Sequence, residues 1–229
     1  MKKLIAIMLC SGMMMSFGAC SAFSSEEEIR GEQISNEEVL EENEIENTEQ
    51  EFSMGKTEDL VYENKFIGIG CTIENNWHFY SDEEIMELNN YTADVAGEEF
   101  EEIMQNADLI YDMYAISDNQ LDNINVNLEK MSKLRLGSLI IEDELEKGIP
   151  VLEDAFKNMG YSNFQAELDT VSIEGEELTC LYTSAEIDGL KMYQKTFPIK
   201  CNGYLATITV TTYEENTVDS IMERFYFIK

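Results

Sequence analysis

The chain has 229 residues and a formal net charge of −32 at pH 7, with 47 acidic against 15 basic side chains. Binding to nucleic acid needs clustered Lys and Arg that displace counterions, so this charge excludes a nucleic-acid-binding protein. It also disfavours electrostatic adhesion to anionic lipid headgroups. A well-solvated surface and a preference for cationic partners both remain compatible with it.

The N-terminus carries the pattern of an export signal. Lys2-Lys3 precedes an apolar run of roughly 14 residues, which is short for a membrane-spanning helix of about 20 residues. The run ends at Phe17-Gly18-Ala19-Cys20, and small residues before a cysteine are typical of a lipoprotein processing site. We therefore predict a signal peptide over residues 1–19 and a lipid on Cys20 that anchors the chain to the membrane. The alternative is an ordinary signal peptide cut near Ala19 or Ala22, which would release the protein.

Residues 20–58 change character abruptly. Glu dominates, Ser, Asn and Gln fill most of the gaps, and no aromatic residue occurs before Phe52 apart from Phe23 near the anchor. Such a composition cannot bury enough apolar surface to offset the entropy of ordering, and its like charges repel and extend it. We predict an acidic disordered tether. The alternative is a segment that binds a cationic wall component or divalent cations.

The remainder, residues 59–229, is long enough for one domain that buries about 70% of its unfolded surface. In its first half, Ser81 and Glu84 form the capping-box pattern of a helix N-terminus, so a helix should run from there to about residue 90. Further elements are expected as strands over residues 61–66, 67–73, 109–117 and 123–130 and as a second helix over residues 95–106.

In the second half, Pro150 is expected to open a helix at its first turn, and Gly160 to end that helix just after its C-cap. Apolar residues then recur with period two. Asp188-Gly189 and Asn202-Gly203 lie between these runs and are strong hairpin signals, and Gly175-Glu176 marks a further turn. The strands are expected over residues 165–174, 177–187, 190–200 and 203–212, followed by a last helix over residues 218–227. This order predicts an α+β domain, in which helices cover the apolar faces of an antiparallel β-sheet.

Several segments resemble the PsbP-like fold, in its bacterial lipoprotein branch. Tyr62–Ile69 reads Tyr-Glu-Asn-Lys-Phe-Ile-Gly-Ile and leads to Trp77-His78-Phe79-Tyr80. The similarity resumes at residues 159–163, 193–194, 203–209 and 225–226, and so extends over nearly the whole segment 60–229. The resemblance implies an α/β/α sandwich. Proteins of this fold include a photosystem extrinsic subunit and a Ran-binding nuclear transport factor, so it also implies a binding or assembly module rather than an enzyme.

The chain departs from that branch at one turn. The branch usually has Pro-x-Gly-Trp, whereas this chain has Glu74-Asn75-Asn76-Trp77. We expect Asn76 to adopt a positive φ in place of the usual Gly.

The sequence contains no recognisable catalytic pattern. His78 is the only histidine, and no nucleophile and base can be paired around it. Zinc sites need several His or Cys at defined spacing, whereas Cys71, Cys180 and Cys201 are odd in number and irregularly spaced. We expect Cys71 and Cys180 to be small buried side chains. The sequence therefore predicts no enzyme, no cofactor and no metal site.

Two polar clusters and the tyrosines were weighed as binding residues. The first cluster offers oxygen ligands of the calcium type but lacks the EF-hand pattern, which favours a polar hairpin loop: Asp118, Asn119, Asp122, Asn123 and Asn125. The second is a set of paired carboxylates, which fits an exposed helix side better than a glycosidase pair: Glu98, Glu99, Glu101 and Glu102. The tyrosines favour core packing, with a sugar- or peptide-stacking surface as the alternative: Tyr111, Tyr114, Tyr182, Tyr193, Tyr204 and Tyr213.

The anchor, the spacer and the lack of a catalytic pattern predict a lipid-anchored, extracytoplasmic, non-catalytic binding or assembly module of the cell envelope. Its partners would be the membrane, through the lipid, and an envelope protein. The alternative is a cell-surface receptor for a small ligand or a divalent cation. Low Arg content beside abundant Lys, Asn and Ile indicates an AT-rich genome and, from that, a Gram-positive host.

Overall fold

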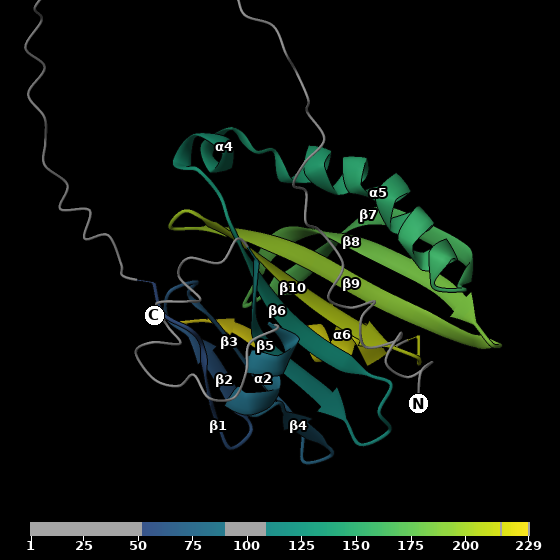
Figure 1. The fold of residues 1–229 in the computed structure, drawn as a ribbon, viewed down its shortest axis with the longest axis horizontal. Helices are drawn as coiled ribbons and strands as arrows, with labels where there is room; N and C mark the ends of the chain where they lie inside the picture. The colour runs from purple at the N-terminus through teal and green to yellow at the C-terminus, as the bar shows by residue number, and fades with distance from the viewer. Residues whose placement is uncertain (1–51, 90–108, 216, 229) are drawn as a thin grey trace, which may run out of the picture.

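The computed structural model describes residues 52–89, 109–215 and 217–228, which form two antiparallel β-sheets and several helices (Figure 1). A four-stranded sheet has the order β1-β2-β3-β11, and a seven-stranded sheet has the order β4-β5-β6-β10-β9-β8-β7. The small sheet comprises β1 (Lys56–Glu58), β2 (Val61–Asn64), β3 (Ile69–Thr72) and β11 (Phe225–Phe227). The large sheet comprises β4 (Trp77–Phe79), β5 (Leu109–Ser117), β6 (Asn123–Lys130), β7 (Ser162–Ile173), β8 (Glu176–Ile187), β9 (Leu190–Cys201) and β10 (Tyr204–Thr212). The helices are α2 (Asp82–Leu88), α4 (Lys133–Ser138), α5 (Ile141–Asn158) and α6 (Thr217–Met222). The predicted α+β class is confirmed.

The two faces of the large sheet are covered differently. One face packs on the small sheet and on α6, and this contact forms the main core, with Phe197, Ile208 and Val126 among its fully buried side chains. Helices α5, α4 and α2 pack on the opposite face. The expected α/β/α sandwich is therefore not confirmed, because a β-sheet takes the place of helices over most of the second face.

Strands β7 to β10 form a meander joined by two-residue turns. Both residues of each turn have positive φ, namely 49° and 90° at Glu174-Gly175, 51° and 82° at Asp188-Gly189, and 34° and 87° at Asn202-Gly203. Turns of this left-handed kind match the natural twist of antiparallel strands. The Asp-Gly and Asn-Gly hairpins are confirmed as predicted, and the third turn lies one residue earlier than expected.

Helix α2 begins as its sequence predicts. The Ser81 hydroxyl accepts a hydrogen bond from the Glu84 backbone N–H (3.3 Å), and the Glu84 carboxylate accepts one from the Ser81 N–H (2.8 Å). This reciprocal pair is the capping box. At the other end, Asn89 fixes the helix to β5, because its side chain exchanges hydrogen bonds of 2.8 and 2.9 Å with the backbone of Tyr111.

Helix α5 begins earlier than predicted but ends where predicted. Pro150 lies inside the helix rather than at its first turn, because the buried stripe that includes Leu145 and Leu152 continues across it, and Pro150 itself is on the exposed side. At the C-terminus, Gly160 (φ +93°) donates to Lys157 O, and Tyr161 N–H donates to Phe156 O. These two bonds satisfy the last carbonyls in a Schellman motif.

His78, the only histidine in the sequence, lies in strand β4, opposite Ile116 of β5. Two other local predictions were wrong. The last helix ends at Met222 instead of residue 227, and Phe225 belongs to β11, which pairs with β3. Asn76 is not among the described residues with positive φ.

The packed domain includes residues that were assigned to the tether from their composition. Phe52 lies against Phe66 and Tyr204, with ring centroids 5.3 Å apart in each pair. Residues 56–58 form β1. The packed domain therefore includes the chain from Phe52 onward, and not only the part from residue 59. Cys20, the signal peptide over 1–19, most of the tether and the helix expected over 95–106 lie outside the described residues. Among the described helices, none is both long enough and apolar enough to cross a membrane.

Candidate functional site

The helix-side face of the large sheet carries a block of buried, uncharged polar side chains at its centre. We name this surface the polar floor, and it comprises Asn123, Asn125 and Asn127 of β6, Thr207, Thr209 and Thr211 of β10, and Gln194 and Thr196 of β9. The strand register aligns them in rows, with Thr209 opposite Asn125 on one side and Thr196 on the other. Polar residues of these types usually face solvent, so eight buried ones on one sheet face require an explanation.

Helices and aromatic side chains frame the polar floor. Helix α5 packs beside it on β7 and β8 through Leu181 and neighbouring side chains, and α2 packs on β5 on the other side through Ile85 and Tyr114. Figure 1 shows β9, β10 and β6 running between these two helices. Helix α4 closes one end by contact with Leu205. At the other end Tyr161 and Tyr213 meet through their hydroxyls at 3.1 Å.

Hydrogen bonds between side chains of the polar floor satisfy only some of its polar atoms. Asn127 Nδ2 donates to Asn125 Oδ1 (2.9 Å), Gln194 Nε2 donates to Thr211 Oγ1 (2.8 Å), and the hydroxyls of Thr196 and Thr209 lie 3.2 Å apart. Within the part of the chain that the structure describes, four buried atoms of the floor have no hydrogen-bond partner, namely Asn123 Oδ1, Asn125 Nδ2, Asn127 Oδ1 and Gln194 Oε1. Each such atom costs about 1–3 kcal/mol of desolvation.

A second polar cluster lies at Asp112, between the two sheets. The register of β5 and β6 shifts between Tyr111 and Met113, which places Asp112 in a β-bulge. Its carboxylate accepts hydrogen bonds from Tyr62 Oη (2.5 Å), Asn64 Nδ2 (2.9 Å) and Gly55 N–H (2.8 Å).

Burial raises the pKa of Asp112 above its ordinary value, and the three donated hydrogen bonds offset part of that rise. Burial and the neighbouring carboxylate hold the pKa of Tyr62 well above its ordinary value, so Tyr62 remains a donor. Every oxygen of the carboxylate is engaged by groups of the fold. We therefore assign this cluster to holding β1 and β2 on the large sheet.

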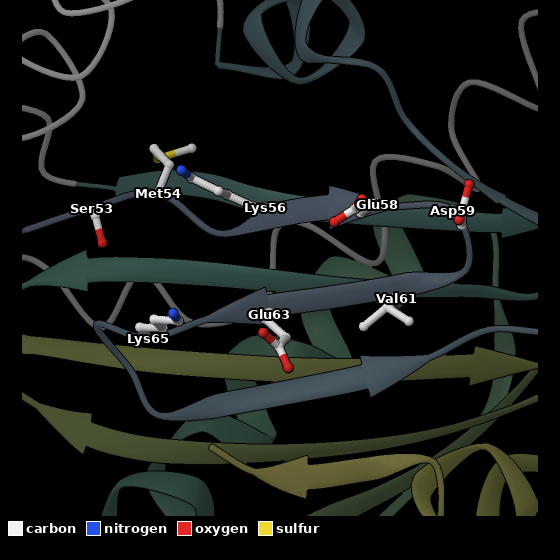
Figure 2. A pocket seen from close by; sticks show the side chains of 8 residues that line it. All are labelled: Ser53, Met54, Lys56, Glu58, Asp59, Val61, Glu63 and Lys65. Carbon is white, nitrogen blue, oxygen red and sulfur yellow. The ribbon is translucent and has the colours of Figure 1, made fainter. Parts of the chain in front are cut away.

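An open hollow of about 590 Å³ lies on the outer side of β1 and β2. Its charged lining has both signs, with Lys56 and Lys65 beside Glu58, Asp59 and Glu63. The side chains spread along the two strands and do not converge on one point (Figure 2). It offers no group that is buried and poised for a ligand.

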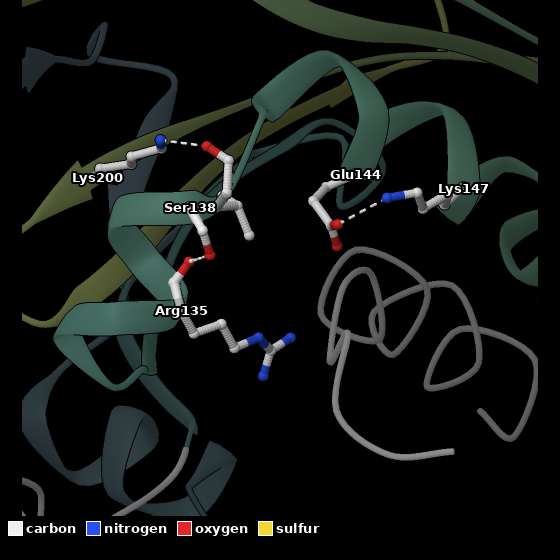
Figure 3. Close-up of polar contacts among 6 residues, drawn as sticks. Arg135, Ser138, Glu144, Lys147 and Lys200 are labelled. Carbon is white, nitrogen blue, oxygen red and sulfur yellow. Dashed lines mark hydrogen bonds and ion pairs between the residues drawn. The ribbon is translucent and has the colours of Figure 1, made fainter. Parts of the chain in front are cut away.

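The connection between α4 and α5 is tied to β9 by a polar contact (Figure 3). Lys200 Nζ donates to the backbone carbonyl of Leu139, in the connection between α4 and α5. Arg135 of α4 lies 3.9 Å from the carboxylate of Glu129 at the end of β6. The buried Glu129 thus places a carboxylate at the end of the floor near α4, whereas the eight residues of the floor itself are uncharged.

The structure divides the five polar residues of the predicted hairpin loop between a strand and a turn. Asn123 and Asn125 are buried in β6, whereas Asp118, Asn119 and Asp122 stay in the β5–β6 turn. There the side chains bond within the fold: Asn119 Nδ2 donates to Asp122 Oδ2 (2.6 Å), and Asp122 Oδ1 accepts from the Tyr213 N–H (2.9 Å). Among the described residues, no group of three His, Cys, Asp or Glu side chains is arranged to hold a metal ion.

The other residues singled out from the sequence are mainly structural. Tyr114 and Tyr204 pack in the core, Tyr193 is buried under Lys191, and Tyr111 and Tyr182 are half-buried. The thiols of Cys71, Cys180 and Cys201 are free, and burial raises the pKa of each to about 12. The four glutamates at 98–102 lie outside the described residues.

Sequence reasoning identified Asn123 and Asn125 for the wrong reason and did not single out the rest of the polar floor. A signal was present, because Asn alternates with Ile124, Val126 and Leu128, and Thr alternates with Ile208 and Val210. Such alternation ordinarily means one buried and one solvated face. Only the tertiary structure shows that both faces are buried.

No protein-family model and no curated protein matches this chain. Two solved structures show weak similarity. One is LpqN, which is involved in cell envelope biogenesis of Mycobacterium tuberculosis; it is 11% identical, with a TM-score of 0.38 over 70% of this chain and 83% of that one. The other is PA94, a protein of unknown function from Pseudomonas aeruginosa; it is 16% identical, with a TM-score of 0.26 over 39% of this chain and 58% of that one. TM-scores this low carry no argument about fold or function.

Proposed function

We propose that the chain is a non-catalytic binding module of the cell envelope, anchored to the outer face of the membrane by a lipid on Cys20, with the polar floor as its binding face. The observation that carries the proposal is the group of four buried amide atoms without hydrogen-bond partners. Buried polar groups are normally satisfied, and those that are not are commonly completed by a ligand or solvent. Membership of the PsbP-like fold is part of the same proposal and rests on the sequence segments quoted above.

The polar floor favours a small ligand over a protein as the binding partner. Protein interfaces centre on exposed aromatic and apolar side chains, and the floor offers buried amides and hydroxyls instead. Recessed polar groups that orient a ligand are typical of small-molecule sites. The sequence left two hypotheses open, a module that binds an envelope protein and a receptor for a small ligand or cation. We put forward the receptor for a small ligand.

Replacing Cys20 with Ser is expected to abolish lipid attachment and release the protein from the membrane fraction. The thioether to the lipid needs the cysteine sulfur, and the acyl chains supply the membrane affinity. Incorporation of labelled palmitate, followed by fractionation of the cells, measures both effects. Cys201→Ser is the matched control, since that half-buried thiol lies in β9. Continued labelling of the Cys20→Ser variant would exclude the anchor.

Replacing Asn125 with Leu is expected to remove a small molecule that co-purifies with the lipidated chain. The full-length protein is isolated from its native membranes in detergent and denatured, and the released compounds are identified by mass spectrometry. Asn158→Leu makes the same substitution at an exposed position of α5 and should retain the compound. Identical small-molecule contents in wild type, Asn125→Leu and Asn158→Leu would contradict a binding site on the polar floor. Turnover of the compound by the isolated protein would contradict a non-catalytic role.

A further inference from the structure

We infer that the ligand of the polar floor is an uncharged polyhydroxylated molecule of the saccharide class. The inference rests on the proposed function, because it takes the polar floor to be a binding face. It goes further by deriving the chemistry of the ligand from the charge, the hydrogen-bonding capacity and the apolar surroundings of the floor.

The first argument is the absence of charge on the floor itself. All eight of its side chains are neutral, in a chain whose formal net charge is −32. At its end, the buried carboxylate of Glu129 lies on the same face of β6 and 3.9 Å from Arg135, and Lys200 donates to the Leu139 carbonyl. An anionic ligand would lose its hydration without meeting an opposite charge on the floor, and that cost is large in a buried site. The site therefore selects neutral ligands over anions.

The second argument is the mixture of donors and acceptors. Asn123 Oδ1, Asn127 Oδ1 and Gln194 Oε1 are acceptors, whereas Asn125 Nδ2 is a donor. Each lies on the same face of three adjacent strands. A hydroxyl group both donates and accepts, so neighbouring hydroxyls satisfy such a mixture in any order. Apolar ligands, by contrast, leave all four atoms unsatisfied.

An extended peptide fits this surface less well than a sugar. The N–H and C=O groups of an extended strand point sideways, along the plane of a sheet, and not toward a floor beneath it. The hydroxyls of a sugar ring project around its rim and reach groups below it.

The third argument is an aromatic side chain at the border of the polar floor. Tyr111 of β5 is half-buried and lies opposite Asn127 in the strand register, whereas Tyr114 packs under α2. Aromatic rings pack against the C–H faces of a sugar while amide groups bond its hydroxyls, because a sugar ring is apolar on its faces and polar at its rim. The same border offers nothing specific to a free inorganic ion.

The test is isothermal titration of the full lipidated chain in detergent with two neutral probes, triacetylchitotriose and maltotriose, and one charged probe, trigalacturonate. We expect at least one neutral probe to bind and the charged probe not to bind. The Asn125→Leu variant should bind the neutral probe about tenfold more weakly, which corresponds to loss of one to two hydrogen bonds. The Asn158→Leu control should bind as the wild type does.

Two further measurements keep the result interpretable if a variant is poorly folded. In the wild-type protein, the side-chain amide NMR signals of Asn125 and Asn127 should shift on addition of the neutral probe, which needs no substitution. Asn125→Leu removes the unsatisfied Nδ2 but also the acceptor of Asn127 Nδ2, so these two changes act in opposite directions on stability. The variant should therefore remain folded at the titration temperature, which circular dichroism checks.

Failure of both neutral probes to bind at low-millimolar concentration would overturn the inference, as would equal binding by wild type and Asn125→Leu, or binding of the charged probe alone. If a co-purifying compound depends on Asn125 but carries charge or lacks hydroxyls, the ligand class is wrong and the binding module stands. If no compound depends on Asn125 and no probe binds, both proposals fail.

Discussion

Replacing Asp112 with Ala is expected to lower the free energy of unfolding by about 4 kcal/mol. The carboxylate accepts hydrogen bonds from the buried side chains of Tyr62 and Asn64 and from the half-buried Gly55 backbone. Removing the carboxylate takes the acceptor away from all three donors at once. Urea denaturation of the chain without its anchor, followed by circular dichroism, measures the change.

Two further variants make this result specific. Asp118→Ala removes an exposed carboxylate from the turn after the same strand and should change stability by less than about 0.5 kcal/mol. Tyr62→Phe removes one donor and should cost less than Asp112→Ala, and the double variant should show that the two losses are not additive. An Asp112→Ala variant as stable as wild type would mean that the cluster does not hold the two sheets together.

Replacing Phe156 with Ala is also expected to cost about 4 kcal/mol, by a different mechanism. Phe156 lies on the buried side of α5 and is fully buried, with its ring 4.9 Å from that of Tyr161 and 5.5 Å from that of Phe164. Truncation leaves a cavity and removes both aromatic contacts, and these contacts fix the helix on β7. The midpoint of thermal unfolding is the readout.

Val151→Ala serves as the control on the same helix. Val151 is 71% exposed, so its truncation should change stability by less than about 0.5 kcal/mol. If Phe156→Ala and Val151→Ala had similar effects, α5 would not be anchored through its buried stripe, and its position as one side of the polar floor would need another explanation.

Local sequence signals predicted the parts of the fold that depend on a few neighbouring residues. Asp188-Gly189 and Asn202-Gly203 adopt positive φ cheaply, so they specify two-residue hairpins without help from the rest of the chain. Ser81 with Glu84 and Gly160 similarly specify one helix start and one helix end. In each case the stabilising hydrogen bonds join residues that are close in sequence.

Predictions failed where a distant partner decides the conformation. Phe225 is compatible with a helix by spacing, but pairing with Cys71 of β3 makes it part of a strand. Pro150 reads as a helix start, but packing of Leu145 and Phe156 on β7 and β8 extends α5 over both sides of it. Phe52 follows an acidic run, yet its contacts with Phe66 and Tyr204 bring it into the core.

In the candidate site, too, local sequence predicted some features and distant contacts decided the others. By itself the sequence determined the α+β class, the β7–β10 meander and the acidic net charge, because these follow from composition, short motifs and periodicity. The anchor at Cys20 remains a prediction from a short motif. The tertiary structure alone decided that Asn123, Asn125 and Asn127 share a buried face with Thr209 and Gln194. Strand order places β6 beside the β9–β10 hairpin, which is distant from it in the chain, and burial depends on which elements cover the sheet. Neither the strand order nor the burial of a sheet face is encoded in a local pattern. The alternating polar residues of β6 and β10 therefore suggested a solvated face, although the structure buries them.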